Sequence, residues 1–279
     1  MSSSPSTPPQ FPSSHRPVAL VTGAARRIGR QIALELAGHG HDVAVHCRHS
    51  RDEAEATAAE LRVLGARAAV VVADLADEAA CRALLPQVLD HFGRLDAVVN
   101  NASLFEYDSA QTCNDAHLAR HWQANTAAPI WLAQALAAHV AERGGQGCVV
   151  NLLDQKLWNP NPDYFSYTLS KAALREATVL LAQALAPRVR VAGVAPGVTL
   201  LSGPMSAEEY AQAHRMTPLE RSSTPEDIAR AVRFLIESPA ITGTTLVVDG
   251  GQHLAAQGRD VLFLARQAPT GPAAPSSKE

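Results

Sequence analysis

Tyr167 and Lys171 stand four residues apart in a stretch with helical spacing. Residues at positions i and i+4 lie on one face of a helix, so the phenol and the ammonium point into the same volume. Opposite charges ~4 Å apart attract by about 4 kcal/mol at an effective dielectric constant of about 20. This attraction is expected to lower the pKa of Tyr167 by up to about three units before desolvation opposes it, which suits proton exchange near neutral pH.

Lysine is scarce in this chain, which strengthens the case for the pair. The sequence contains only Lys156, Lys171 and Lys278, against twenty-one arginines. Because arginine serves wherever a surface needs a cation, a lysine inside a helix indicates a need for a compact ammonium group. The spacing alone fits a structural pair on a helix equally well.

A second candidate feature is the turn that follows the first apolar run, which reads Thr22-Gly-Ala-Ala-Arg-Arg-Ile-Gly29. Glycine and small residues between a strand and a helix let the backbone approach a diphosphate, whose charge then lies at the helix N-terminus. The turn therefore favours dinucleotide binding. A glycine-containing turn of any α/β protein is the alternative.

The tip of the second apolar run reads His46-Cys-Arg-His-Ser50, with no acid before Asp52. An NAD site usually places an acid there for the ribose 2′-hydroxyl. Arg48 and Ser50 can instead bind a 2′-phosphate, and at about 1.5–3 kcal/mol for each bond they predict a preference for NADP of about a hundredfold. The alternative is a solvated basic loop. A metal pair of His46 and His49 is discounted, because no third ligand is near.

The elements that must position these groups follow from two alternating periods. Short β-branched runs indicate strands buried on both faces, at residues 17–23, 42–47, 68–74, 95–102, 147–154, 188–196 and 244–250. Helical spacing lies between them, at residues 30–37, 52–64, 78–92, 115–142, 166–186 and 225–237. The sequence predicts an α/β fold, a single doubly wound parallel sheet of seven strands with helices on both faces. Ligands of such sheets bind beyond the carboxyl ends of the strands.

The composition of the chain indicates its domain organisation and argues against several classes of protein. The tails at 1–16 and 267–279 are rich in Ser and Pro and are expected to be disordered, leaving one domain at 17–266. A net charge of −3 argues against a nucleic-acid binder, and no apolar stretch approaches the ~20 residues of a membrane span. Four widely separated cysteines favour neither disulfides nor zinc, so a cytoplasmic protein is expected.

Five motifs together resemble the short-chain dehydrogenase/reductase family in order and spacing, over nearly all of residues 17–251. They are the TGxxxRIG turn, Asn100-Asn-Ala102, Tyr167-xxx-Lys171, Pro196-Gly197 and the closing Val248-Asp-Gly-Gly251. The resemblance implies that Tyr167 is the proton donor, that Lys171 binds the nicotinamide ribose, and that Asn125 completes a proton relay. It also implies that Asp74 and Leu75 contact the adenine.

Two departures from the family pattern narrow the choice. Arg27 replaces the usual second glycine of the turn, and Asp154 replaces the usual serine. With the motifs at 46–50 and 100–105, they resemble the pteridine reductases and the bacterial dihydromonapterin reductases. That resemblance implies that Arg27 lies by the cofactor phosphates and the pterin, and that Asp154 works with Tyr167 in proton delivery. It also implies that Ser103 and Phe105 border a pterin held between Phe105 and the nicotinamide.

The expected cofactor-binding residues are Gly23, Arg27, Ile28, His46, Arg48, His49, Ser50, Asp74, Leu75, Asn100, Ala102, Ser103, Tyr167, Lys171, Pro196 and Gly197. The expected substrate-binding residues are Arg27, Ser103, Phe105, Asp154 and Tyr167. The expected catalytic residues are Tyr167, Lys171, Asp154 and Asn125, and no metal site is expected.

The function expected from these residues is the NADPH-dependent reduction of a dihydropterin, such as dihydromonapterin, dihydrobiopterin or dihydrofolate, to the tetrahydro form. A carbonyl or enoyl reductase and a non-catalytic dinucleotide sensor remain as alternatives. The family resemblance implies a homodimer or homotetramer that pairs the helices at 115–142 and 166–186, and no nucleic-acid or membrane partner is expected. Residues 199–218 are expected to cover the substrate. No role is carried over to Arg259, although some pteridine reductases bring a C-terminal arginine from a neighbouring subunit.

Overall fold

The computed structural model describes residues 16–201 and 205–267. Seven parallel strands form one sheet in the order β3-β2-β1-β4-β5-β6-β7. The strands are β1 (Val18–Val21), β2 (Asp42–Cys47), β3 (Ala68–Val72), β4 (Ala97–Asn100), β5 (Gly147–Leu152), β6 (Val189–Pro196) and β7 (Thr245–Val248). This arrangement confirms the predicted fold class.

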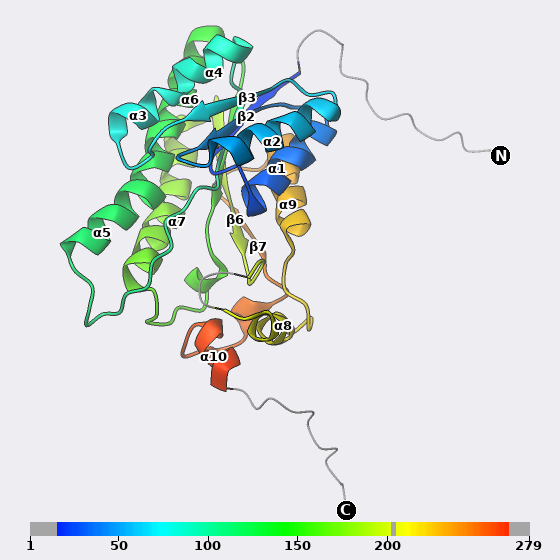
Figure 1. The fold of residues 1–279 in the computed structure, drawn as a ribbon. Coiled ribbons are helices and arrows are strands. Elements are labelled where there is room, and N and C mark those ends of the chain that lie inside the picture. The colour runs from blue at the N-terminus through cyan, green and yellow to red at the C-terminus, as the bar shows by residue number, and fades with distance from the viewer. Residues whose placement is uncertain (1–15, 202–204, 268–279) are drawn as a thin grey trace, which may run out of the picture.

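The strands lie between two layers of helices, as Figure 1 shows. Three helices cover one face and pack on it through apolar contacts. They are α1 (Arg27–Gly38), α2 (Arg51–Val63) and α9 (Pro225–Glu237). The other face carries α3 (Glu78–Arg82), α4 (Leu84–Phe92), α6 (Ala128–Arg143) and α7 (Phe165–Leu185). A further helix, α5 (Asp115–Trp122), packs against α7. Because both faces are covered, every residue of β1, β2, β4 and β5 is buried, which explains their continuous apolar sequence.

Two predicted helices are interrupted. The stretch at 78–92 is split into α3 and α4 at Ala83. The stretch at 115–142 contains a π-helical turn, Gln123–Ala127, between α5 and α6. Periodicity did not reveal either break, because the apolar spacing continues through both. The π turn carries Asn125, one of the expected catalytic residues, and such turns are frequent at functional sites.

Two further helices, α8 (Ala207–Arg215) and α10 (Val261–Gln267), lie beyond the carboxyl ends of the strands. They pack on each other through a small apolar cluster that includes Met205, Ala213 and Leu262. A short helical stretch within 199–218 was expected, but α10 was not. These helices therefore lie over the edge of the sheet at which ligands are expected to bind.

The predicted tails fall almost wholly outside the described residues. Arg16, at the end of the predicted N-terminal tail, and Gln267, at the start of the C-terminal one, are described. The guanidinium of Arg16 donates hydrogen bonds to the carbonyl oxygens of Ala37 (3.0 Å) and Gly40 (3.1 Å), at the end of α1. These bonds join the start of the described chain to the turn that follows α1.

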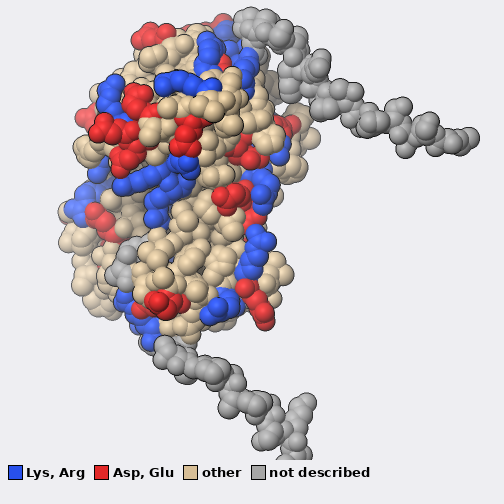
Figure 2. Space-filling view, turned by 45° about the vertical axis from the view of Figure 1, so that its right-hand side comes forward, with Lys and Arg blue, Asp and Glu red and all other residues tan. Residues whose placement is uncertain are grey.

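The surface carries both signs of charge. Figure 2 shows Lys and Arg side chains gathered across the middle of one face, next to a group of Asp and Glu side chains. Exposed ion pairs such as Arg26 with Glu53 and Arg30 with Glu60 join the two signs. In residues 16–201 and 205–267, no helix has the length and apolar character needed to cross a membrane.

Candidate active site

The predicted phosphate-binding turn leads from β1 into α1 with little room to spare. Gly23 has a φ of +63°, and a Cβ at Gly29 would lie 2.3 Å from the carbonyl oxygen of Gly23. The N-cap of α1, Arg26, makes no side-chain capping bond, and the first turn holds no acidic residue. The helix therefore presents unpaired backbone N–H groups and its positive dipole end, which fits the diphosphate of a dinucleotide.

Arg27 departs from ordinary backbone geometry at this turn. Its φ is +58°, a left-handed conformation that glycine adopts without strain and that costs other residues about 1 kcal/mol or more. Its Nη2 donates to the carbonyl oxygen of Leu201 at 2.9 Å, and the side chain lines the central cavity. The guanidinium thus lies between the phosphate-binding turn and the segment after β6.

The turn is held by side chains that motif reasoning did not single out. Thr22 Oγ1 accepts hydrogen bonds from the backbone N–H groups of Asn101 (2.9 Å) and Ala102 (3.0 Å). Asn101 Nδ2 donates to the carbonyl oxygen of Thr22 at 2.8 Å. These bonds tie β1 to the end of β4. The signal was present in the adjacent Asn100-Asn101 pair, which was read only as a family motif.

His46 lies in a different place from the one expected. Its ring is buried, and Nδ1 accepts from the backbone N–H of Gly23 at 3.1 Å while Nε2 donates to the carbonyl oxygen of Ala73 at 3.1 Å. Burial lowers its pKa to about 4, so the ring is neutral. With both ring nitrogens engaged inside the protein, the side chain positions the turn.

The tip of β2 presents the residues expected to select a 2′-phosphate. Arg48 and His49 are exposed, and Ser50 begins α2 without using its side chain as a cap. Arg48 Nη1 lies 3.8 Å from Asp74 Oδ2, a long and exposed ion pair worth little. Arg48 and Ser50 therefore remain available to an anionic ligand, whereas Leu75 is buried beside them.

The other end of the site contains a close pair of acidic groups. Tyr167 on α7 donates its hydroxyl proton to Asp154 Oδ2, just beyond β5, at 2.8 Å. The second carboxylate oxygen of Asp154 accepts the backbone N–H of Lys156 at 2.8 Å. Both carboxylate oxygens are thus held, and the phenol points at the carboxyl group. This is the arrangement needed to pass a proton from one to the other.

The electrostatics of this pair correct an expectation. Burial, then the charge of Asp154, raise the pKa of Tyr167 well above its usual 10, whereas Lys171 was expected to lower it. Lys171 Nζ lies 5.9 Å from the centre of the Tyr167 ring and donates to the carbonyl oxygen of Leu152 at 2.7 Å. The nearest charge to the phenol is therefore negative. Burial also raises the pKa of Asp154 and lowers that of Lys171 to about 8.

Asn125 lies in the π-helical turn, and its amide is fully engaged. Its Oδ1 accepts the N–H of Leu104 at 2.7 Å and the hydroxyl of Ser103 at 3.2 Å. Its Nδ2 donates to the carbonyl oxygen of Leu104 and to Ser170 Oγ, at 2.9 and 3.0 Å. The described contacts of its side chain therefore link the segment after β4 to α7 and do not include Tyr167 or Lys171. Its expected place in a proton relay is not visible.

An aromatic wall borders the site. Phe105 stacks on Tyr164 with ring centres 4.2 Å apart and planes inclined by 16°. Its ring also meets Tyr167 edge-on at 4.7 Å. Phe105 is 42% exposed, so part of its surface is free to contact a flat ring. Tyr164 was not expected here; it is the N-cap of α7, with a left-handed backbone conformation that no sequence motif marked.

A cavity of about 240 Å³ brings many of the expected residues together. Those lining it are Arg27, Ile28, Ser103, Phe105, Asp154, Tyr167, Lys171, Pro196 and Gly197. Those outside it are Gly23, His46, Arg48, His49, Ser50, Asp74, Leu75, Asn100, Ala102 and Asn125, which lie along the phosphate-binding edge or behind it. Asn100 is buried and donates to Asn151 Oδ1 at 2.8 Å, so its side chain joins β4 to β5 instead of facing a ligand.

The outer wall of the cavity comes from segments late in the chain. Thr199, Leu200 and Met205 line it, as expected of a substrate-covering segment, while residues 202–204 lie outside the described part. Asp260 and Leu262 also line it, from the start of α10. Among residues 16–201 and 205–267, no group of three or more His, Cys, Asp or Glu side chains is placed to hold a metal ion.

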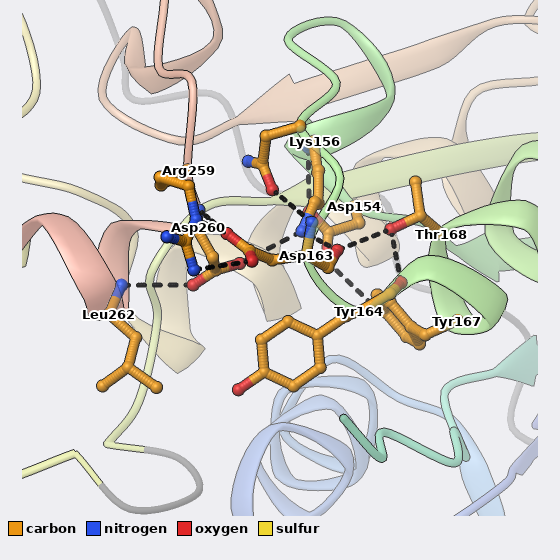
Figure 3. A network of polar contacts seen from close by, with 10 residues as sticks. Asp154, Lys156, Asp163, Tyr164, Tyr167, Thr168, Arg259, Asp260 and Leu262 are labelled. Carbon is orange, nitrogen blue, oxygen red and sulfur yellow. Dashed lines mark hydrogen bonds and ion pairs between the residues drawn. The ribbon is translucent and has the colours of Figure 1, made fainter. Parts of the chain in front are cut away.

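The segment before α10 is fixed by two ion pairs, shown in Figure 3. Arg259 binds both carboxylate oxygens of Asp163, at 2.8 and 2.9 Å. Lys156 Nζ lies 3.3 Å from Asp260 Oδ2. The guanidinium of Arg259 is therefore engaged within its own chain, with the loop that leads into α7.

Sequence comparison shows which known proteins this chain resembles. Residues 23–253 match the family model described as Enoyl-(Acyl carrier protein) reductase. The granaticin polyketide synthase putative ketoacyl reductase 2 of Streptomyces violaceoruber is 35% identical over 253 residues, covering 85% of this chain and 96% of that protein. Pteridine reductase 1 of Leishmania tarentolae is 34% identical over 280 residues, again covering 85% of this chain and 96% of that protein.

Solved structures show the same relationship. FolM Alternative dihydrofolate reductase 1 from Brucella canis, complexed with NADP, has 44% sequence identity and a TM-score of 0.80, covering 86% of this chain and 95% of that one. The protein of the same name from Brucella suis, also in complex with NADP, has 44% identity and a TM-score of 0.79, covering 86% and 96%. The likeness therefore extends over most of both chains.

Proposed function

The chain belongs to the short-chain dehydrogenase/reductase family of oxidoreductases, and from this premise we propose that it reduces a dihydropterin to the tetrahydro form with NADPH. The observation that carries the proposal is the 2.8 Å hydrogen bond from Tyr167 to Asp154, in a cavity also bordered by Arg27 and Phe105. The pteridine reductase and FolM relatives support the substrate class.

NADPH is the proposed cofactor because the residues along the sheet edge fit its phosphates. The uncapped N-terminus of α1 suits the diphosphate, and Arg48 with Ser50 suits the 2′-phosphate. Lys171 would hold the nicotinamide ribose, and Pro196 and Gly197 would border the nicotinamide ring. When bound, NADPH supplies the hydride.

The residues of this chain supply the proton. The reduced C=N bond gains a hydride at carbon and a proton at nitrogen, and Tyr167 is placed to donate that proton. A protonated Asp154 returns a proton to Tyr167 across their 2.8 Å hydrogen bond, which avoids leaving a phenolate beside a carboxylate. Phe105 provides a face for the flat ring, with stacking worth about 0.5–1.5 kcal/mol.

This mechanism sets the direction of the pH dependence. Burial raises the pKa of Asp154, so the carboxyl stays protonated up to a higher pH than an exposed aspartate. Since the protonated form is the active one, we expect kcat to fall as the pH rises through that pKa.

The experiment is a comparison of substrates and variants. Purified protein is expected to oxidise NADPH with dihydromonapterin, dihydrobiopterin or dihydrofolate. Tyr167→Phe is expected to lose turnover by about 10²–10⁴-fold while the Kd for NADPH stays unchanged, because the hydroxyl donates the proton and the ring is retained. A wild-type protein that turns over none of these pterins would disprove the function, and an unchanged rate in the variant would exclude Tyr167 as the donor.

A carbonyl reductase is the second candidate, because the granaticin ketoacyl reductase and a 3-oxoacyl-[acyl-carrier-protein] reductase of Staphylococcus aureus are 35% and 33% identical to this chain. Asp154→Ser separates the two, because serine is the residue that the family usually has at this position. The substitution is expected to abolish turnover of pterins. Turnover of β-ketoacyl thioesters by the wild-type protein, without turnover of pterins, would favour the second candidate.

We further propose that the reductase unit is residues 17–266 and that it forms a homo-oligomer through the helices at 115–142 and 166–186. Exposed apolar side chains on these helices support this, namely Leu118, Trp122, Leu169, Val179 and Leu180. The molar mass of the purified protein in solution tests the assembly.

A further inference from the structure

The ammonium group of Lys156 is buried close to the proposed proton pathway. Lys156 and Lys171 are the two lysines among the described residues, and each is only 3% exposed. Lys171 has an expected role at the cofactor, but Lys156 has none in the function proposed above. A buried lysine is costly unless its charge is compensated, so its place requires an explanation.

Lys156 joins two segments that are far apart in the sequence. Its Nζ donates to the carbonyl oxygen of Asp163 at 2.6 Å and to Asp260 Oδ2 at 3.3 Å. The other carboxylate oxygen of Asp260 accepts the N–H of Leu262 at 3.1 Å, at the start of α10. The ammonium also lies 5.4 Å from the centre of the Tyr164 ring. Figure 3 shows these groups converging beside Asp154.

The same residue touches Asp154 through its backbone. The N–H of Lys156 donates to Asp154 Oδ1 at 2.8 Å, while Oδ2 faces Tyr167. A side chain anchored between Asp163 and Asp260 therefore fixes the peptide group that orients the carboxyl. Both ends of Lys156 are engaged, one at the carboxyl and one at the C-terminal segment.

We propose that Lys156 and Asp260 act as a pair of positioning residues, which orient the Asp154 carboxyl beside Tyr167 and set the charge of its surroundings. The inference rests on the proposed function, because it assigns Asp154 the supply of the proton. It makes the C-terminal segment a part of the proton-delivery site, although neither member of the pair is placed to touch the reacting atoms.

The two charges act on Asp154 in opposite directions. The groups that face its carboxyl are Tyr167 and Lys171 from α7, Lys156 from the turn after β5 and Asp260 from the segment before α10, and Arg27 from α1 lines the same cavity. The cation of Lys156 lowers the pKa of Asp154, and the anion of Asp260 raises it, against the larger effect of burial. The two charges of the ion pair therefore offset each other in their effect on the pKa of Asp154.

The test replaces each charge by a neutral side chain of similar size. Lys156→Met is expected to raise the pKa of Asp154 by about one pH unit, and Asp260→Asn to lower it by about one pH unit. The high-pH limb of kcat with a dihydropterin is expected to move in the same directions. A purely structural pair would lower activity in both variants without opposite shifts.

Two further variants make the test decisive. Lys156→Arg keeps the positive charge and is expected to retain the wild-type pH profile of kcat. Arg259→Met removes the neighbouring ion pair with Asp163, whose charges are not among those facing Asp154, and is expected to leave its pKa in place. Thermal unfolding and NADPH affinity identify any variant that fails to fold, and Asp260→Asn, at a partly exposed site, provides a second route if Lys156→Met does.

The pKa itself is measured by NMR titration of carboxyl-labelled aspartate, with Asp154→Asn assigning the signal. Shifts in one direction, or none, in two folded variants would overturn the inference. This measurement does not require pterin turnover. A wild-type protein without pterin activity would therefore refute the proposed function alone, and the titration would still decide the role of the pair.

Discussion

At the scale of single residues, Arg27 combines an unfavourable backbone conformation with a side chain that lines the cavity. Its φ of +58° is where the family pattern usually has glycine, which would occupy it without strain. Strain retained at a residue that lines the cavity indicates a contribution to binding. The two properties can be separated by substitution.

Arg27→Gly and Arg27→Ala both remove the guanidinium, but only the alanine variant keeps a Cβ at positive φ. We expect both to bind NADPH at least tenfold more weakly, from the loss of one charge-assisted bond worth about 1.5–3 kcal/mol. The glycine variant is expected to have a free energy of unfolding about 1 kcal/mol higher than the alanine variant. Denaturant titration and NADPH titration measure these quantities. Equal stability of the two variants would show that the backbone is unstrained.

At the scale of elements, His46 couples β2 to the phosphate-binding turn, and the coupling requires a neutral ring. Nδ1 accepts the N–H of Gly23, so a proton on that nitrogen would break the bond. The folded protein holds the pKa of His46 at about 4, below the unfolded value of 6.5. Between these values the unfolded chain binds more protons, so stability is lost as the pH falls from about 6.5 to about 4.

We expect this single ring to account for about 3 kcal/mol of the acid-induced loss of stability. His46→Gln, which does not titrate, is expected to have a lower free energy of unfolding at pH 7 and a weaker dependence on pH between 6.5 and 4. His91→Gln, at an exposed position on α4, serves as the matched control. Denaturant unfolding at several pH values checks this, and a wild-type slope in His46→Gln would remove the role assigned to the ring.

The seven strands and their parallel, doubly wound arrangement followed from the sequence because buried parallel strands need continuous apolar runs, and the chain supplies seven of them. Gly23 and the Tyr167–Lys171 pair were found from local spacing, which is set by one turn or one helix. Arg27 was singled out because it departs from the family pattern. The π turn that carries Asn125 was not found, since one extra residue in a helix leaves the apolar period almost unchanged.

The contributions of Lys156, Tyr164 and Asp260 were also missed, for a different reason. Lys156 and Asp260 are 104 residues apart in the sequence, and nothing local marks them as partners. The direction of the Tyr167 pKa was wrong because helical spacing brings Lys171 to the same face, whereas the hydrogen bond from the hydroxyl goes to Asp154. Contacts made by tertiary structure set the charge around each group.

At the scale of the whole molecule, the proposed cofactor would span the sheet edge from the tip of β2 to the end of β6. Binding there links both halves of the sheet, so it stabilises the entire fold. At an NADPH concentration of about 100 times Kd, we expect about 2.7 kcal/mol of added stability and a rise in Tm of roughly 5–10 °C. Thermal unfolding with and without ligand measures the shift.

The same experiment tests the 2′-phosphate assignment. Arg48→Asp is expected to lose most of the shift with NADPH at an equal concentration and to keep the smaller shift with NADH, since only NADPH carries the phosphate. A Tm that falls equally for both nucleotides would place the 2′-phosphate elsewhere. The exposed position of Arg48 makes a general loss of folding an improbable cause of either result.

The burial of Lys156 and Lys171 also affects how the protein responds to chemical labelling. Throughout the described residues, every side-chain amine is enclosed at the site, while the exposed cations are guanidinium groups that acylating reagents leave untouched. Lys171, with a pKa of about 8, has an appreciable unprotonated fraction at neutral pH. Acylation mapped by peptide mass would therefore report on access to the cavity.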